Sequence, residues 1–247
     1  MIADKLRVAI LQAAISGQLT EQLPEDGTAT DLLNQIAKEK TALVKDGKLK
    51  KQKPLPPVTE EEKPFNIPKN WEWVRISSIG SVVSGGTPKT SESSYWNGTV
   101  AWVTPADLGR LKDRYISNGL RSITEAGLAA SSARLMPAGS VIMSSRAPIG
   151  YVAIALNALS TNQGCKSLVP TLPAMSEYIY YALLARSRAL SEKGSGTTFK
   201  EVSGKVFASF LVPLPPFPEQ GRIVAKLDKL MPLIDQLVEL ERERERI

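Results

Sequence analysis

The sequence predicts an α+β fold: one α/β domain of short, mostly antiparallel strands, with a helical N-terminal segment and a long C-terminal coiled-coil helix. Three observations support this prediction. Apolar residues recur at helical spacing near the N-terminus. Short runs of β-forming residues, separated by Gly, Ser, Pro and Asn, fill the middle of the chain. A heptad-like apolar pattern follows them near the C-terminus.

Residues 1–47 are expected to form a helical segment. Its first helix has Asp4 as the expected N-cap and Gly17 as the expected left-handed C-cap. The second is expected to begin near Thr28 or Thr30. The apolar positions that predict the two helices are Leu6, Ile10, Ala13 and Ala14 in the first, and Leu32, Leu33, Ile36, Leu43 and Val44 in the second.

Residues 48–69 differ from their neighbours in being rich in both proline and charge (KLKKQKPLPPVTEEEKP). Proline removes a backbone donor and disfavours helices and central strands, and charged residues resist burial. We therefore expect this segment to be an extended tether that does not pack.

The pattern of residues 70–215 is typical of a separate domain. Short strands are expected at WEWVRI, VAWVT, SVIMSS, YVAIAL and KSLVP, and one helix is expected over 174–190. The loops between them are long for such strands, an arrangement in which a rigid scaffold displays recognition residues.

Residues 216–247 are expected to form one long helix. A coiled-coil seam with spacings of 4, 3, 4 and 3 is made by Ile223, Leu227, Leu230, Ile234 and Leu237. Pro232 falls inside this pattern and is expected to kink the helix. No Gly, Pro or polar C-cap follows, so we expect the chain to end within the helix, either as a fragment or with its seam completed by another copy.

Composition narrows the possible functions. Lys and Arg outnumber Asp and Glu by 31 to 25, a balance that favours polyanionic partners. The chain has no histidine and one cysteine, Cys165, which excludes internal disulfides, the usual zinc sites and histidine-based catalysis. We expect no metal and no cofactor. No apolar run is long enough to span a bilayer, so a cytoplasmic location without membrane contact is expected.

The tetrapeptide LPPF, residues 214–217, differs by one residue from the Asp/Asn-Pro-Pro-aromatic loop of adenine methyltransferases. In that loop the first side chain must accept hydrogen bonds from the target amino group. Leu214 has no acceptor. The motif is therefore interpreted as a turn, and methyl transfer by this chain is not expected.

The order of the motifs resembles that of the DNA specificity subunit of type I restriction-modification systems. The residues that carry the resemblance are LRVAILQAAISGQLTEQ (6–22), the KPLPP tether leading to IPKNWEWVRI (53–76), GSVVSGGTP (80–88), STNQGC (160–165), GTTFKEVSGKVF (196–207) and LVPLPPFPEQGRIVAKLDKLMPLIDQL (211–237).

This resemblance implies a target-recognition domain that reads one half of a split site in double-stranded DNA. It also implies long helices that set a spacing and dock methyltransferase subunits and a restriction subunit. The catalytic tetrapeptide and the S-adenosylmethionine site would belong to those partner subunits. Family members usually carry two recognition domains and two helical segments. This chain has one of each, which makes a homodimer through the C-terminal helix one way to read a two-part site.

Four loops of the recognition domain are expected to supply the DNA contacts. Arginine pairs with guanine, Asn and Gln pair with adenine, and lysines, bare glycine backbone and helix N-termini hold phosphates. The candidate DNA-binding residues are Gly85, Gly86, Thr87 and Lys89; Ser145 and Arg146; Asn162, Gln163 and Lys166; and Lys193, Ser195, Thr197, Thr198 and Lys200.

Each candidate has an ordinary structural alternative. The glycines would serve a hairpin turn, Arg146 a surface salt bridge, and Asn162 a cap on its own backbone. Lys166 would be solvated surface, and residues 192–205 a mobile loop. A further basic cluster at Arg110, Lys112 and Arg114 is explained equally well as a solvated face.

Three further features favour structural roles. The four tryptophans, Trp71, Trp73, Trp96 and Trp102, have β-branched neighbours and are expected in the core instead of stacking on bases. Cys165 is expected to be a small buried residue. The E-x-K fragment at Glu61 and Lys63 lies in the tether and is attributed to chance.

The competing class is a coiled-coil scaffold for protein interactions, in which the basic charge is incidental. Its discriminating observation would be assembly without a gel shift on random duplex at low salt. An independent enzyme is the third class.

Overall fold

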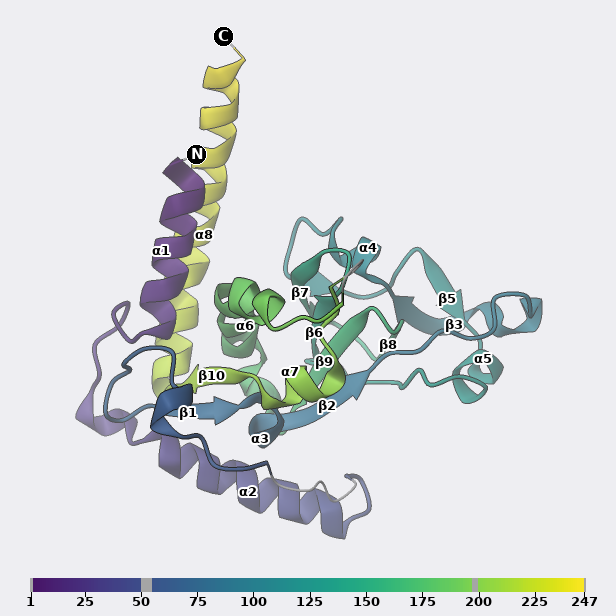
Figure 1. Ribbon diagram of the computed structural model, residues 1–247, viewed down its shortest axis with the longest axis horizontal. Coiled ribbons are helices and arrows are strands. Elements are labelled where there is room, and N and C mark those ends of the chain that lie inside the picture. The colour runs from purple at the N-terminus through teal and green to yellow at the C-terminus, as the bar shows by residue number, and fades with distance from the viewer. Residues whose placement is uncertain (1, 50–54, 197–199, 247) are drawn as a thin grey trace.

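The structure, a computed structural model, describes residues 2–49, 55–196 and 200–246. An α+β domain lies beside a pair of long helices (Figure 1), which confirms the predicted fold class. The longer helices are α1 (Ile2–Ile15), α2 (Ala29–Lys45), α6 (Ser176–Glu192) and α8 (Phe217–Glu245). The shorter ones are α3 (Ile76–Ile79), α4 (Pro105–Leu108), α5 (Glu125–Ala129) and α7 (Gly204–Ser209).

The strands form three small sheets. A five-stranded sheet has the order β2 (Gly80–Ser84), β9 (Cys165–Pro170), β6 (Val141–Ser145), β7 (Ile149–Ala155) and β4 (Tyr115–Ile116). A three-stranded sheet has the order β5 (Arg121–Ile123), β3 (Trp96–Val103) and β8 (Ser160–Thr161). Pairing is antiparallel except for β4 with β7 and β3 with β8.

The third sheet consists of β1 (Glu72–Arg75) and β10 (Leu211–Leu214), one strand from each end of the central domain. Their antiparallel register pairs Glu72 with Leu214 and Arg75 with Leu211. The two strands therefore lie side by side, close to the positions where the composition of the sequence changes.

Both faces of the five-stranded sheet are buried, which explains the continuous apolar runs of its strands. Val141 and Met143 face the cluster that includes α6, while Ile142 faces the opposite cluster with Cys165. Helix α6 packs along β7. It occupies the place predicted for the single helix of the domain, shifted by two residues.

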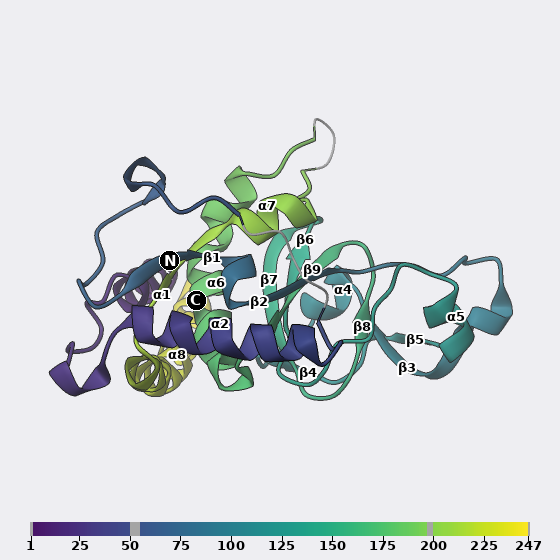
Figure 2. The same cartoon turned by 90° about the horizontal axis from the view of Figure 1, so that it is seen from below.

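Helix α2 lies along the underside of the domain, beside β1 and β2 (Figure 2). Ala29, Leu32 and Ile36 pack with Val74 and Ile76 in one core cluster. The side chain of Thr28 accepts a hydrogen bond from the Asp31 amide, so Thr28 is the N-cap, one of the two residues expected.

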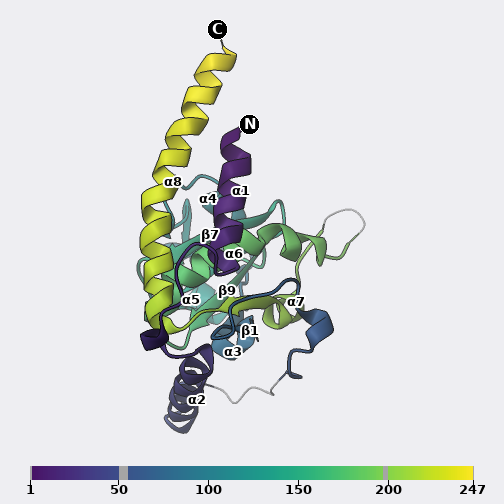
Figure 3. The ribbon, with the colours of Figure 1, turned by 90° about the vertical axis from the view of Figure 1, so that its left-hand side faces the viewer.

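Helices α1 and α8 run antiparallel, with their far ends at the same side of the molecule (Figures 1 and 3). Seam residues Ile223, Leu227 and Ile234 are buried among residues of α1 and α6. Leu230 and Leu237 are half-buried. The expectation that a second copy completes this seam is therefore wrong for its buried positions, because α1 of the same chain covers them.

Two details of the N-terminal prediction are also corrected. Asp4 lies inside α1, which begins at Ile2, so it is not the N-cap. Leu6 is exposed, and the buried face of α1 is made by Ala3, Leu11, Ala14 and Ile15. The left-handed residue after the helix is confirmed, since Gly17 has a φ of 77°.

The described part of the tether packs against the domain, contrary to expectation. The ring of Phe65 meets Trp73 edge to face, with ring centroids 4.9 Å apart. Arg75 donates hydrogen bonds to Glu62 and to the Pro56 carbonyl. Aromatic and arginine contacts therefore outweigh the polarity of the segment.

No described helix is long and apolar enough to cross a membrane.

Candidate nucleic-acid interface

The four candidate loops, far apart in sequence, come together in space. The Gly86 amide donates to the Thr161 carbonyl at 2.9 Å, and the Ser145 amide donates to the Gly164 carbonyl at 2.7 Å. The Val202 amide donates to the Ser145 carbonyl at 2.9 Å. We call residues 84–87, 144–148, 160–166 and the described part of 192–205 the loop cluster.

The loop between β6 and β7 is fixed by Ser144. Its buried hydroxyl donates to the Pro148 carbonyl at 2.8 Å and accepts from the amides of Gly150 and Tyr151 at 3.1 and 2.9 Å. Between these anchors Ala147 has a φ of 54°, a strained conformation for a residue with a Cβ. Backbone strain of this kind is common where a loop presents functional groups. Arg146 is thus carried on a pre-organised loop.

A carboxylate joins the two cations of the loop cluster. Glu201 lies 3.8 Å from Arg146 Nη1 and 3.3 Å from Lys166 Nζ. Arg146 keeps about a third of its side-chain surface exposed, so it is both paired and accessible. The salt-bridge alternative for Arg146 therefore exists in the structure, although its exposure leaves room for a DNA contact.

Lys166 and Ser145 are enclosed. The Lys166 side chain is 6% exposed, and its ammonium donates to Ser145 Oγ, the Gln163 carbonyl and Glu201. All three of its donors are used. In this arrangement neither residue reaches a phosphate, so both expectations, the phosphate clamp and the solvated lysine, are corrected: Lys166 holds the loops together from inside.

Gly85 and Gly86 are buried and serve packing. A Cβ on Gly85 would lie 1.9 Å from the Asn162 carbonyl oxygen, and one on Gly86 would lie 2.3 Å from the Ala133 nitrogen. Only glycine fits such close backbone contacts. The expected contact between bare glycine backbone and phosphate is therefore not available at either position.

Two amide side chains in the loop after β8 have different surroundings. Asn162 Oδ1 accepts from the Gly164 amide at 2.9 Å, so this side chain caps its own turn. Gln163 is exposed and accepts a hydrogen bond from the Thr87 hydroxyl. Gln163 is therefore the more accessible amide of the pair.

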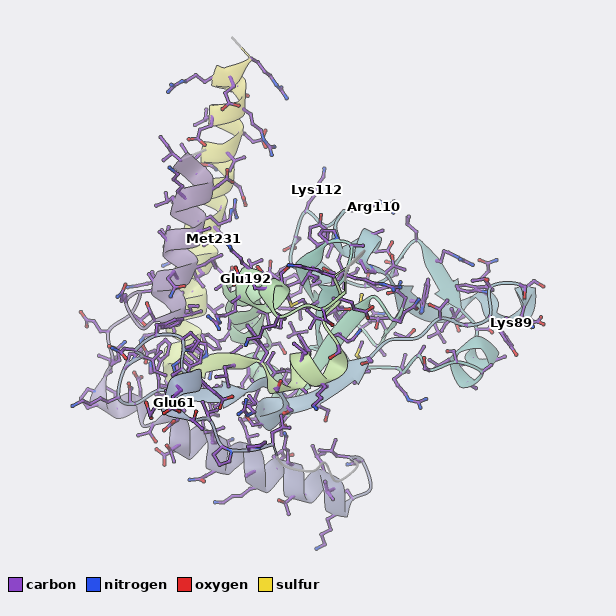
Figure 4. All side chains as sticks on the ribbon, viewed as in Figure 1. Glu61, Lys89, Arg110, Lys112, Glu192 and Met231 are labelled. Carbon is purple, nitrogen blue, oxygen red and sulfur yellow. The ribbon has the colours of Figure 1, made fainter. Side chains whose placement is uncertain are left out.

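The remaining candidates lie at the edge of the cluster or beyond it. Lys193, Ser195 and Lys200 are exposed, whereas Thr197 and Thr198 lie outside the described residues. Lys89 sits at the outer end of the domain, and Arg110 and Lys112 lie together on another face (Figure 4).

The core predictions hold in the structure. The tryptophans Trp71, Trp73, Trp96 and Trp102 are all buried. Cys165 is fully buried, and loss of solvation raises the pKa of its thiol to about 12. A thiol with so high a pKa is not a nucleophile at neutral pH.

Arg114 is the centre of a junction between the domain and α8. Its guanidinium binds both carboxylate oxygens of Asp228 at 2.6 and 3.0 Å, and Nε lies 3.1 Å from Glu177 of α6. Tyr181 donates to the same Asp228 at 2.7 Å. The hydrogen bond with Asp228 raises the pKa of Arg114. Arg114 is therefore a structural residue, which corrects the solvated-face interpretation for this member of its basic cluster.

The LPPF segment is a strand-to-helix turn. Leu214 ends β10 and is fully buried, and Pro216 precedes α8. Two residues into the helix, Glu219 accepts hydrogen bonds from Thr20, Gln22 and Trp71. This buried carboxylate joins α8 to the segment that follows α1 and to the residue that precedes β1.

Sequence reasoning missed Glu219, Asp228 and Glu201, the carboxylates that join distant segments. For Glu201 a signal was present, because a single acid lies within the basic stretch FKEVSGK. The other two face partners about 50 to 200 residues away in the chain, a separation that no local pattern reports.

An α+β domain of short strands carried on an antiparallel helix pair is also the architecture of solved type I restriction-modification proteins. The HsdS subunit from Thermoanaerobacter tengcongensis superposes with a TM-score of 0.54 and 22% identity, over 97% of this chain and 53% of that one. A structure of type I R-M system assembly and conformational transition gives a TM-score of 0.58 and 23% identity, over 99% and 53%. At this identity the likeness concerns the fold.

The chain belongs to the type I restriction modification DNA specificity domain family, whose model matches residues 68–245. The MjaIX specificity subunit of Methanocaldococcus jannaschii is 39% identical over 183 residues, 73% of this chain and 41% of the relative. The EcoAI specificity subunit of Escherichia coli is 31% identical over 254 residues, 95% and 41%. The chain thus spans about two fifths of these relatives. The resemblance inferred from the sequence is confirmed.

Proposed function

We propose that this chain recognises one half of a bipartite site in double-stranded DNA and positions a separate N6-adenine methyltransferase and a restriction subunit on it. The observation that carries the proposal is the loop cluster, in which half-buried Arg146 and exposed Gln163 lie on loops that contact each other. The segment whose Glu201 pairs with Arg146 also carries exposed Lys193 and Lys200. Membership of the specificity family supplies the class of ligand.

The side chains of the cluster suit duplex DNA chemically. An arginine fork pairs with guanine and an amide pairs with adenine, while exposed lysines hold phosphates. Pre-organisation of the loop by Ser144 lowers the entropy that binding would otherwise cost. The recognition side chains are therefore Arg146 and Gln163, and the phosphate contacts are Lys193 and Lys200.

A second apolar stripe on α8 supports docking of a protein partner. Leu230, Leu233, Leu237 and Leu240 follow each other at spacings of 3, 4 and 3 beside the buried seam. Leu233 and Leu240 are 59% and 62% exposed. Exposed leucines in a row on a helix are typical of an interaction face. The partner is a methyltransferase subunit or a second copy of this chain.

A second copy has a specific argument in its favour. The chain aligns along 99% of its own length with 53% of a solved type I chain. Two copies paired through the second stripe would thus supply the equivalent of two recognition domains. The scaffold function, in which α8 assembles proteins without DNA readout, rests on the same exposed leucines and is the second candidate.

Fluorescence anisotropy on a labelled mixed-sequence duplex at low salt separates the two candidates. We expect binding whose log affinity falls linearly with log salt, and we expect Arg146→Ala to weaken it. Arg110→Ala is the matched control, because Arg110 is an exposed arginine of the same domain outside the loop cluster. Assembly of the chain without any duplex binding would favour the scaffold.

Light scattering then tests the stripe. Leu233→Ser with Leu240→Ser should abolish self-association or methyltransferase capture while duplex binding by the chain persists. Retained association in this variant would show that the stripe is not the docking face.

A further inference from the structure

Glu201 is an acidic side chain that lies between two cations of the loop cluster, Arg146 and Lys166. Its two oxygens are shared between the cations of the loop cluster, 3.3 Å from Lys166 Nζ and 3.8 Å from Arg146 Nη1. Its side chain is 40% exposed, so it faces solvent as well as the two cations. A ligand that reaches Arg146 therefore meets Glu201 too.

The position of Glu201 is set by its backbone. Its amide donates to the Ser195 carbonyl at 2.9 Å, and its own carbonyl accepts from the Ser195 amide at 3.1 Å. The next residue, Val202, is buried and donates to the Ser145 carbonyl. Three hydrogen bonds and one buried neighbour thus fix the residue beside Arg146, whose loop is fixed in turn by Ser144.

The two cations respond differently to this carboxylate. Lys166 is enclosed, and its ammonium already donates to two other acceptors, so Glu201 only neutralises its charge. Arg146 is accessible and makes no second ion pair among the residues that the structure describes. The carboxylate therefore competes there with any anion that approaches from solvent. A phosphate at Arg146 would lie close to a like charge, which repels it.

We infer that Glu201 is a specificity-determining residue that restrains Arg146 and weakens binding to non-cognate duplex. The inference rests on the proposed function. Repulsion of phosphate acts on every DNA sequence, whereas contacts to base edges offset it only on the correct sequence. A repulsive group that penalises the wrong ligands raises the ratio of specific to non-specific affinity.

The test is Glu201→Gln, which keeps the shape of the side chain and removes its charge. On a mixed-sequence duplex we expect the dissociation constant to fall about fivefold, the scale of one exposed ion pair. The slope of log affinity against log salt should become steeper by about 0.9, because Arg146 then neutralises one more phosphate. Thermal unfolding checks that the variant is folded.

The matched control is Glu239→Gln, which causes the same change in net charge. Glu239 pairs with Arg242 at 2.9 Å on the part of α8 that projects away from the sheets (Figure 1), so its removal also frees an arginine. This control should leave duplex affinity and salt slope unchanged. A second control introduces Glu201→Gln into an Arg146→Gln background, where the gain in affinity should disappear.

Each outcome has one meaning. A gain in Glu201→Gln that is absent in both controls supports the inference. Equal behaviour of Glu201→Gln and Glu239→Gln overturns it and leaves the proposed function intact. Weaker duplex binding by Glu201→Gln also overturns it, because the carboxylate would then accept from a base amino group. No binding by the parent protein contradicts the proposed function and the inference together.

Discussion

Removal of the Arg114 side chain should loosen the junction between the recognition domain and α8. Arg114 makes a two-pronged pair with Asp228, a second pair with Glu177 and a hydrogen bond with Tyr181. Its side chain is 19% exposed, and those of Asp228 and Glu177 are 37% and 32% exposed. The exposure of this network is therefore intermediate between that of a surface ion pair and that of a buried ion pair.

The expected cost follows from that position. An exposed ion pair contributes up to about 1 kcal/mol, and loss of one partner of a buried pair costs about 3–5 kcal/mol. Arg114→Ala is therefore expected to lower the free energy of unfolding by about 2 kcal/mol. For a chain of this size the midpoint of thermal unfolding should fall by about 4–8 °C.

The assay is thermal unfolding followed by circular dichroism, with Arg110→Ala as the control. Arg110 is 61% exposed and lies 4.0 Å from Asp107, so its removal should change the free energy of unfolding by less than about 0.5 kcal/mol. If Arg114→Ala and Arg110→Ala unfolded at the same temperature, the junction would have no energetic role and the argument from its geometry would be refuted.

Two further predictions concern stability. Arg222 pairs with the enclosed carboxylate of Asp26 at 2.5 Å and lowers the pKa of that carboxylate, so the pair stabilises the fold above the ordinary pKa of an aspartate and loses this effect as pH falls through the lowered pKa. Asp26→Asn should therefore be less stable at neutral pH, and its stability should fall less steeply with acid in an unfolding titration. An unchanged steepness would contradict this prediction. Gly86→Ala would place a Cβ 2.3 Å from the Ala133 nitrogen, so it should lower the free energy of unfolding in urea by more than about 2 kcal/mol. Gly221→Ala on α8 is the control, because nothing lies within 4 Å of its Cβ, and it should not lower the free energy of unfolding.

Sequence patterns that involve only neighbouring residues predicted the helices, strands and turns of the fold well. The apolar spacing of the long helices, the short runs of β-formers and the turn at LPPF all concern neighbours in sequence, and each appears in the structure. The changes of composition near residues 70 and 215 were visible in the sequence. The pairing of β1 with β10, which lie next to those positions, was not visible.

The loops named as candidates lie together in the structure, but only some of their candidate side chains are accessible. All four loops meet, yet burial removes Lys166, Ser145 and the two glycines from contact with a ligand. Burial depends on what other segments cover, and sequence spacing does not report it. Glu201 and Arg114 show the same limit, because their roles come from partners on distant elements. The seam of α8 was found, while its partner α1 was not.

The central claim is that this chain chooses where a separate methyltransferase acts on DNA. It is tested most directly by methylation of a library of random duplexes with the partner methyltransferase subunit, in the presence and in the absence of this chain, with the modified adenines mapped by sequencing. The account predicts one recurrent motif that is modified only when the chain is present. An identical pattern of modification with and without the chain would contradict it.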